Sequence, residues 1–354
     1  MSQFFSKKYG RLVPYTPGEQ PKERKYIKLN TNESPFPPSP KAIEYAAEAA
    51  KGLQLYSDPE CRILTDALAK TYGVTRDQVL PTNGSDEILN FAFMAFCDAA
   101  HPALFADITY GFYSVFAELN NVPYEIIPLR EDFTVSVDDY IGREGTVFIA
   151  NPNAPTGIAL PLSEIERLLQ SNPDRVVVID EAYVDFGTES AITLVDRYPN
   201  LLVTQTFSKS RSMAGARLGY GIANADLIAD LNTVKYSTNP YNVNSMTMAA
   251  GVGMLADADY TKKNCQAIIE NRAWTAEQLK SLGFEMTDSR ANFLFAKHPR
   301  IDGGTIYTEL RARGVLVRHF DKPRISPYNR ITVGSREQME CLIQAIRNIL
   351  EERL

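Results

Sequence analysis

The chain has 354 residues, of which 44% are hydrophobic and 23% are charged, and its net charge is −6 at pH 7. This length is enough for a large core and a smaller second domain, and the acidic balance argues against a general binder of nucleic acid or of acidic membranes. Four scattered cysteines without a CxxC pair indicate a reducing compartment, which we expect to be the cytoplasm, and three histidines without ligand spacing predict no metal site.

The first 40 residues are rich in proline and polar groups, and they predict an extended N-terminal arm (1–40). They contain no long apolar core, so we expect no signal peptide, and no apolar run of the chain approaches the length that spans a bilayer. A disordered tail is the ordinary alternative for this arm. However, the segment LNTNESP, which contains Asn32, holds more polar side chains after an apolar run than a tail requires.

Two helices are expected next. Residues 41–52 read as a helix that ends at a glycine. A second helix is expected to begin near Pro59, with Ser57 or Asp58 as its cap. Tyr56 lies just before this cap, where a lone tyrosine is more often a packing residue than a functional one.

A strand, a tight turn and an amphipathic helix are predicted over residues 78–98. Gly84, Ser85 and Asp86 start this helix, and a helix N-terminus preceded by glycine offers free N–H groups to a phosphate. Many helices start in this way, so the pattern is weak by itself. In the following strand–helix unit Tyr110 opens the helix, where an aromatic ring can stack on a flat cofactor or act as a hydrophobic staple.

A further apolar run, predicted to be a buried strand, ends in an aspartate. The run VVVIDEAY places Asp180 directly after β-branched apolar residues, and Tyr183 follows three residues later. An ionised carboxylate at the end of a buried strand needs a cationic partner, and a protonated pyridine ring would be one. The hydroxyl of Tyr183 could then reach the neighbouring phenolic oxygen of that ring.

A lysine follows the next strand-like run, LLVTQTF. Lys209 lies near Thr206 and Ser208, and Arg217 follows it beside small residues. A lysine in an apolar pocket suits a Schiff base, and hydroxyls with a fixed guanidinium suit a phosphate. A surface turn with ordinary charges is the alternative for this segment.

Strands and helices alternate from residue 79 to residue 223, which predicts an α/β fold with a mostly parallel sheet and helices on both faces. A nicotinamide-binding Rossmann fold is the runner-up, but no GxGxxG follows the first strand. A long helical tract then reaches about Leu282. We therefore expect a large domain over 41–282 and a small α+β domain over 283–354, to which the arm is assigned. The small domain contributes Arg318 and Arg330 near strand ends. For either arginine a salt bridge at the surface is the alternative.

Three motifs together carry a family resemblance: SKSRSMAGARLG from residue 208, NPNAPTG at 151–157 and RITVGSRE from residue 330. They resemble the fold-type I family of pyridoxal-phosphate (PLP) enzymes, the aspartate aminotransferase superfamily, and within it the histidinol-phosphate aminotransferases. The similarity extends from about Tyr15 to the C-terminus. It implies PLP as the cofactor, a large domain with a smaller C-terminal one, and a C2 homodimer.

The resemblance also implies roles for single residues. Lys209, Asp180 and Tyr183 would be the catalytic residues, with Lys209 holding PLP and Asp180 facing the nitrogen of its ring. The cofactor would further contact a set of polar and small residues, namely Gly84, Ser85, Asp86, Tyr110, Asn153, Thr206, Ser208 and Arg217, together with Tyr56 from the second subunit. Relatives often carry asparagine immediately before PTG, whereas this chain has Ala154. Either Asn153 makes the missing bond to the ring or Tyr183 acts alone, and we expect Asn153.

Substrates would be bound by Tyr15, Asn32, Arg318 and Arg330, with Arg330 gripping a carboxylate. The expected reaction exchanges an amino group between histidinol phosphate and 2-oxoglutarate, in histidine biosynthesis. A threonine-phosphate decarboxylase and an aromatic amino-acid aminotransferase share these motifs and remain alternatives. A non-catalytic PLP-binding regulator usually carries an added DNA-binding domain, for which 354 residues leave no room.

Overall fold

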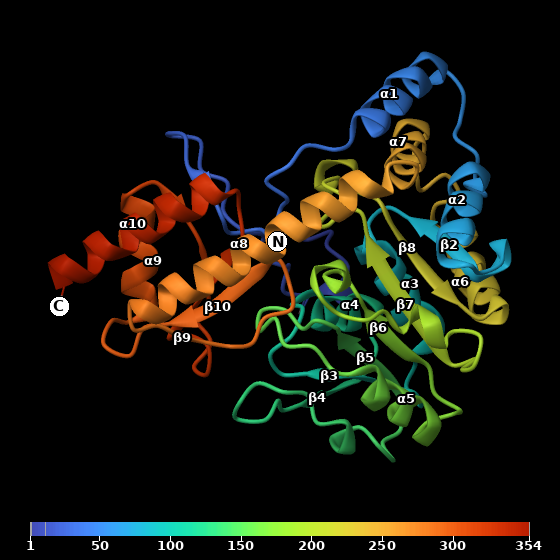
Figure 1. Cartoon of the computed structure of the whole chain (residues 1–354). Helices are drawn as coiled ribbons and strands as arrows, with labels where there is room; N and C mark the ends of the chain where they lie inside the picture. The colour runs from blue at the N-terminus through green and yellow to red at the C-terminus, as the bar shows by residue number, and fades with distance from the viewer. Residues whose placement is uncertain (1, 11, 354) are drawn as a thin grey trace.

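The structure is a computed structural model that describes residues 2–10 and 12–353. A seven-stranded sheet forms the centre of its larger part (Figure 1). The strand order is β2 (Val79–Thr82), β8 (Gly219–Ala223), β7 (Leu201–Thr206), β6 (Val177–Asp180), β5 (Thr146–Ala150), β3 (Ala103–Ala106) and β4 (Tyr124–Ile127). Every strand except β8 runs parallel to the others, which confirms the predicted α/β fold.

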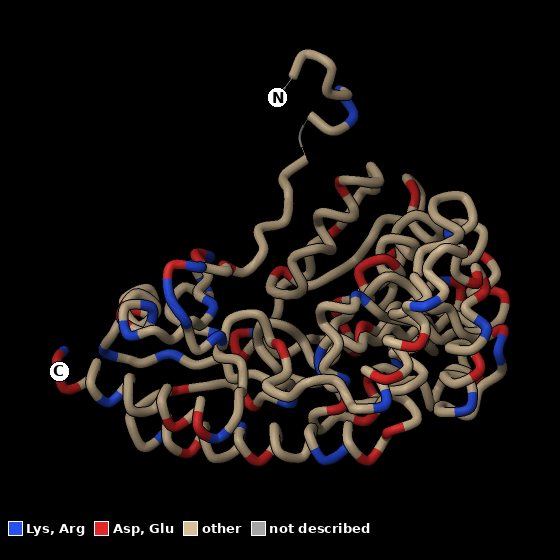
Figure 2. The backbone as a smooth tube through the Cα atoms, turned by 90° about the horizontal axis from the view of Figure 1, so that it is seen from above, with Lys and Arg blue, Asp and Glu red and all other residues tan. Residues whose placement is uncertain are grey.

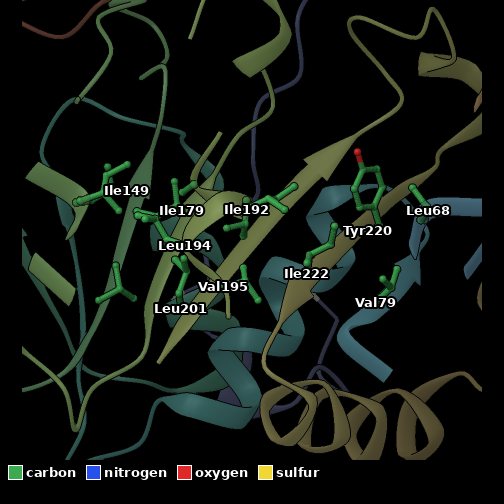
Figure 3. Close-up of a cluster of buried hydrophobic side chains, with 14 of the residues drawn as sticks. Leu68, Val79, Ile149, Ile179, Ile192, Leu194, Val195, Leu201, Tyr220 and Ile222 are labelled. Atoms are coloured by element: carbon green, nitrogen blue, oxygen red, sulfur yellow. The ribbon is translucent and has the colours of Figure 1, made fainter. Parts of the chain in front are cut away.

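The inner strands are buried on both faces, as parallel sheets require. Because side chains alternate along a strand, Val147 and Ile149 join one hydrophobic cluster and Phe148 joins the other. Figure 3 shows part of the first cluster, where Ile149 and Ile179 from neighbouring strands lie near the loop residues 192–195. These two apolar layers hold the ends of the strands in fixed positions.

Helices cover both faces of the sheet. On one face lie α3 (Ser85–Phe96), α4 (Phe112–Asn120) and α6 (Ala225–Thr238). On the other lie α2 (Arg62–Tyr72), α5 (Leu162–Ser171) and α7 (Ser245–Leu255), and α1 (Pro40–Ala49) packs on α7 (Figure 1).

The smaller part is built on an antiparallel sheet in the order β12 (Arg318–His319), β13 (Tyr328–Thr332), β10 (Phe293–Lys297) and β9 (Glu285–Met286). Helices α9 (Gly303–Ala312) and α10 (Arg336–Arg353) pack on it. The long helix α8 (Ala258–Ser281) runs from α7 into this part (Figure 1), and its Cys265, Ile268 and Leu279 belong to the smaller core. Because α8 serves both parts, the division at 282/283 stays a prediction.

The inner section of the N-terminal arm is packed, which the sequence did not lead us to expect. Strand β1 (Ile27–Lys28) pairs in parallel with β11 (Val315–Leu316), and Leu29 is buried in the smaller core. The outer section runs away from the body of the protein (Figure 2). Acidic and basic residues are interspersed along the whole tube in the same view.

Two helix predictions need correction. Helix α2 begins at Arg62 and not near Pro59, because Cys61 has a left-handed φ of 50° and a turn precedes it. The carboxylate of Asp58 accepts the backbone N–H of Arg62 at 3.0 Å and closes that turn. The tract expected to reach Leu282 is two helices, α7 and α8. Within residues 2–10 and 12–353 no helix is long and apolar enough to cross a bilayer, and no three metal-ligating side chains cluster.

Candidate active site

A cavity of about 370 Å³ opens at the edge of the sheet where the parallel strands end. Its wall is assembled from the turns that follow five strands and from the arm: Gln20, Thr31, Glu33, Ser85, Asp86, Tyr110, Ala150, Pro152, Ala154, Asp180, Ala182, Tyr183, Thr206, Ser208, Lys209, Ala214, Gly215 and Arg217. Since the carboxyl ends of parallel strands meet at one edge, residues far apart in the sequence converge there. The volume is in the range of small-molecule sites.

Lys209 reaches into this cavity from the loop after β7. Its Nζ donates a hydrogen bond to the backbone oxygen of Thr31 at 3.2 Å and lies 5.8 Å from the centre of the Tyr183 ring. Burial lowers the pKa of Lys209 to about 8, and the guanidinium of Arg330 acts in the same direction. An amine with a pKa near neutrality is a competent nucleophile and proton carrier.

Asp180 lies deeper, at the end of β6, and is 5% exposed. Its carboxylate accepts hydrogen bonds from the hydroxyls of Tyr113 at 3.1 Å and Thr204 at 3.5 Å. Burial nevertheless raises the pKa of Asp180 to about 6. In the part of the chain that the structure describes, these partners are neutral, so a cationic ring nitrogen in the cavity would complete the site.

The N-terminus of α3 at Ser85, the glycines Gly84 and Gly219, and the guanidinium of Arg217 form a concave site, which we call the cup. Gly84 has a φ of 77°, and a Cβ atom there would lie 2.7 Å from Nη2 of Arg217. A Cβ atom at Gly219 would lie 2.4 Å from the backbone nitrogen of Ser85. Only glycines therefore let the helix N-terminus and the guanidinium converge, and this arrangement fits a phosphate group.

Polar side chains complete the cup. Thr206 donates a hydrogen bond to the hydroxyl of Ser208 at 3.0 Å. Asp86 accepts from Nη2 of Arg217 at 2.8 Å and from the hydroxyl of Tyr110 at 2.6 Å. Asp86 therefore orients both the guanidinium and the aromatic ring beside the cavity. The phosphate and the ring of PLP fit this set of donors and aromatic surface.

Asn32 lies behind Tyr183 and not in the cavity wall. Its side-chain nitrogen donates to the hydroxyl of Tyr183 at 2.9 Å, and its oxygen accepts from Thr332 at 3.0 Å. It is 1% exposed and contacts the site through Tyr183, so its contact with a substrate stays a prediction. Asn32 holds the tyrosine hydroxyl in place from the small-domain side.

The geometry also disagrees with the expectation for Asn153. Its side-chain nitrogen donates to the backbone oxygen of Ile108 at 2.9 Å and to Thr156 at 3.1 Å, and its oxygen accepts from Thr109 at 2.8 Å. Both side-chain N–H groups are thus occupied by Ile108 and Thr156, and Asn153 lines a neighbouring cavity instead. Ala154 faces the site, so of the two options from the sequence the structure favours Tyr183 acting alone.

Arg318 and Arg330 are not among the residues that line the cavity, although the guanidinium of Arg330 is close enough to lower the pKa of Lys209. Arg318 and Arg330 are opposite each other on β12 and β13. Arg330 donates from Nη2 to the backbone oxygen of Asn30 at 3.0 Å, while its buried Nε has no hydrogen-bond partner among the described residues. The hydrogen bonds of Arg318 within the described residues are long, at 3.4 Å, and go to two backbone oxygens of the arm. Both guanidinium groups therefore keep donors for an anion.

Two expected residues lie at the periphery. Tyr15 stacks on Phe112 with ring centres 4.2 Å apart and lies 6.5 Å from Tyr110. Tyr56 is 84% exposed, stacks on Tyr241 and makes no contact with this cavity.

Sequence reasoning missed Tyr113, the donor to Asp180. It is fully buried in α4 among aromatic neighbours, and nothing in its sequence context separates it from an ordinary core residue.

A buried aspartate and a lysine of lowered pKa at the ends of adjoining strands, beside an anion-binding helix start, are the features of a fold-type I PLP-dependent enzyme. The chain belongs to the class I and II aminotransferases, because the family model described as "Aminotransferase class I and II" matches residues 24–346.

Individual relatives agree with this family. The chain is 48% identical over 353 residues to the histidinol-phosphate aminotransferase of Marinomonas sp. (strain MWYL1), covering 99% of this chain and 100% of the relative. It is 49% identical over 347 residues to histidinol-phosphate aminotransferase 1 of Pseudomonas aeruginosa PAO1, covering 98% and 99%. The solved histidinol-phosphate aminotransferase of Sinorhizobium meliloti, in complex with pyridoxal-5'-phosphate, has the same fold, with a TM-score of 0.89 at 23% identity over 99% of both chains.

Proposed function

We propose that this chain is a PLP-dependent aminotransferase that exchanges the amino group between histidinol phosphate and 2-oxoglutarate, a step of histidine biosynthesis. The observation that carries the proposal is the similarity, at 48–49% identity and over nearly the full length of both chains, to histidinol-phosphate aminotransferases. The two opposed arginines support it, because the substrates of this reaction carry a phosphate or two carboxylates.

PLP would be held by the residues that line the cavity. Lys209 would attach it, the cup at Ser85 with Thr206, Ser208 and Arg217 would bind its phosphate, and Asp180 would keep its ring nitrogen protonated. When bound, the cofactor supplies an electron sink for negative charge at the substrate α-carbon.

The protein groups would then manage the proton. The amine of Lys209 can accept a proton from the substrate α-carbon and return one, since a pKa of about 8 suits both directions at neutral pH. Tyr183, held by Asn32, would offer its hydroxyl to the ring. Arg330 would fix the acidic group of the substrate and so limit the orientations of the α-carbon relative to Lys209.

We also propose a C2 homodimer in which Tyr56 serves the active site of the second subunit. Apolar side chains around this residue are exposed to an unusual degree: Leu53 is 54%, Leu55 71% and Tyr56 84% exposed, and Ile43 of α1 is 55% exposed. Such a patch favours a protein contact, and a second copy of the chain would bury it. The four cysteines are unpaired, which supports a reducing compartment such as the cytoplasm.

The test is an assay of the purified, PLP-loaded protein with histidinol phosphate and 2-oxoglutarate, in which glutamate is measured. Phenylalanine as amino donor and phosphothreonine as a source of carbon dioxide test the two alternatives. Glutamate formation that is fastest with histidinol phosphate is the expected result. A preference for phenylalanine, or release of carbon dioxide, would overturn the substrate assignment.

A further inference from the structure

A second hydrogen-bonded cluster lies on the opposite face of β6 and β7 from the cavity. Because side chains alternate along a strand, Asp180 and Thr204 face the cavity, whereas Glu181 and Gln205 face the other side. We call this group the rear cluster, and it consists of Tyr72, Glu181, Asp185, Gln205, Arg211 and Tyr220. None of these residues is used by the proposed mechanism.

The rear cluster is buried and well connected. The amide nitrogen of Gln205 donates to Glu181 at 2.8 Å, and its oxygen accepts from the hydroxyls of Tyr72 at 2.8 Å and Tyr220 at 2.6 Å. Arg211 donates from Nη2 to the hydroxyl of Tyr72 at 2.9 Å, and its side chain is only 9% exposed. A buried guanidinium keeps one geometry, because leaving any donor unpaired is costly.

Asp185 joins this cluster to the chain beside Lys209. Its Oδ2 accepts hydrogen bonds from the hydroxyl of Ser210 and from Nη1 of Arg211, the latter at 3.2 Å. Asp185 itself lies two residues after Tyr183, in the turn that follows β6. The segment that carries Tyr183 and the segment that carries Lys209 are therefore bonded to each other immediately behind the cavity.

Lys209 has little else to hold it. Among the residues that the structure describes, its amine makes one hydrogen bond, to the backbone oxygen of Thr31, which belongs to the arm. A lysine side chain is flexible, and proton transfer requires a defined position of its nitrogen. The direction of the Lys209 side chain must then come from the backbone at residues 209–211.

We propose that Asp185 and Arg211 are positioning residues that hold Lys209 against Tyr183 and Asp180. This inference rests on the proposed role of Lys209 as the residue that binds the cofactor. Loss of either residue lets the loop after β7 move, so that the amine of Lys209 becomes better hydrated and less well placed for proton transfer.

Asp185 and Arg211 carry opposite charges. The pKa of Lys209 in variants of each therefore distinguishes a positioning role from a purely electrostatic effect. Removing the cation in Arg211→Met would raise the pKa of Lys209 through the field alone, whereas removing the anion in Asp185→Asn would lower it. Loss of position raises it in both variants, because burial is the main reason for its low value. The other groups that act on Lys209, namely Arg330, Glu33, Asp86 and Arg217, are unchanged in both variants.

The experiment measures the pKa of the free Lys209 amine in the cofactor-free full chain. It is read from the pH dependence with which Lys209 is acylated, followed by mass spectrometry of the peptide that contains it. We expect both variants to raise this pKa by on the order of one pH unit, and to lower kcat more than they change KM for the amino donor.

A matched control is Arg175→Met. Arg175 precedes the same strand β6 at its other end and pairs with Glu144, so its loss disturbs the fold without touching the loop at Lys209. Arg211→Lys keeps the charge but cannot bond Asp185 and Tyr72 in the same way. It should raise the pKa of Lys209 by less than Arg211→Met does. Circular dichroism establishes that each variant is folded. If Arg211→Met does not fold, the pKa of Lys209 is measured in Tyr72→Phe instead. This change alters no charge and removes one hydrogen-bond partner of Arg211, so it should also raise that pKa.

Shifts in opposite directions, or no shift in either variant, overturn the positioning role. This result is independent of the substrate assay. Wild-type protein that fails with histidinol phosphate but shows both shifts would disprove only the proposed function. Active protein without the shifts would disprove only the positioning role.

Discussion

Arg318 and Arg330 are direct partners across β12 and β13, so two guanidinium groups lie on the same face of the smaller sheet. Like charges in directly opposed positions destabilise a sheet unless something offsets them. Here backbone oxygens of the N-terminal arm accept from both arginines, and a substrate anion would add the missing counter-charge. The pair thus links the arm, the small domain and the acidic groups of the substrate.

Replacing Arg318 by alanine should weaken catalysis with histidinol phosphate more than with phenylalanine. Loss of one charged hydrogen bond costs roughly 1.5–3 kcal/mol, which is about tenfold to a hundredfold in kcat/KM. The two efficiencies are compared in wild type, in Arg318→Ala and in Arg300→Ala, an exposed arginine of the same domain. An equal loss of kcat/KM for both substrates would show that Arg318 does not bind the phosphate.

Borohydride reduction of the PLP-loaded protein should fix the cofactor on Lys209. The lowered pKa of this amine and its place among the phosphate donors make it the expected attachment point. Peptide mass spectrometry locates the label, and the Lys209→Ala protein serves as the control. A label on another lysine in the wild type would refute the site.

Changing Asp180 to asparagine should leave PLP bound but slow turnover by about two to four powers of ten, because a buried charge partner is worth about 3–5 kcal/mol. Single-turnover kinetics measure the effect. Thr204→Val removes one hydrogen bond to the same carboxylate while keeping its charge, so its loss should be far smaller. Nearly normal turnover of Asp180→Asn would mean that this aspartate is only structural.

Mixed dimers test the proposed role of Tyr56. Lys209→Ala and Tyr56→Ala proteins should each be nearly inactive, whereas subunit exchange between them should restore part of the activity. One of the two sites in the mixed dimer would then have both residues intact. The exchange is followed by the transamination assay after mild unfolding and refolding of the mixture. Absence of recovery in a mixture shown to contain mixed dimers would exclude a shared site.

Glu181 should make stability depend on pH. Burial raises its pKa from 4.5 to about 7, so the folded state retains a proton that the unfolded state has lost between these values. The contribution of Glu181 to stability is therefore complete below pH 4.5 and falls as pH rises to 7, by on the order of a few kcal/mol.

The matching variant is Glu181→Gln, which cannot ionise. The difference between the urea midpoint of Glu181→Gln and that of the wild type should increase in favour of the variant from pH 4.5 to pH 7. Both proteins are measured without cofactor. Glu340→Gln, at an exposed position of α10, should show no such trend. A difference that stays constant with pH would contradict the raised pKa.

The sequence by itself determined the fold class and the polar residues that the large domain contributes to the cavity wall. The apolar runs before Asp180 and Lys209 are stable as buried strands inside a mostly parallel sheet. The polar residues that follow them then lie together at the carboxyl edge of that sheet. The glycine before α3 likewise indicated an anion site, because a free helix N-terminus is a local property.

Contacts between distant segments were decided only by the tertiary structure. The side chain of Asn153 turned away from the cavity because the backbone oxygen of Ile108 and the hydroxyl of Thr109 lie within its reach, a contact between the loops after β5 and β3 that no local pattern encodes. Tyr113 and Asn32 likewise act through residues far away in the chain, at Asp180 and Tyr183. The same holds for the rear cluster, where Arg211 looked like an ordinary loop charge until folding brought Tyr72 and Asp185 to it. Periodicity and composition predict which face of an element is buried, but the partner of a polar side chain depends on how the elements pack.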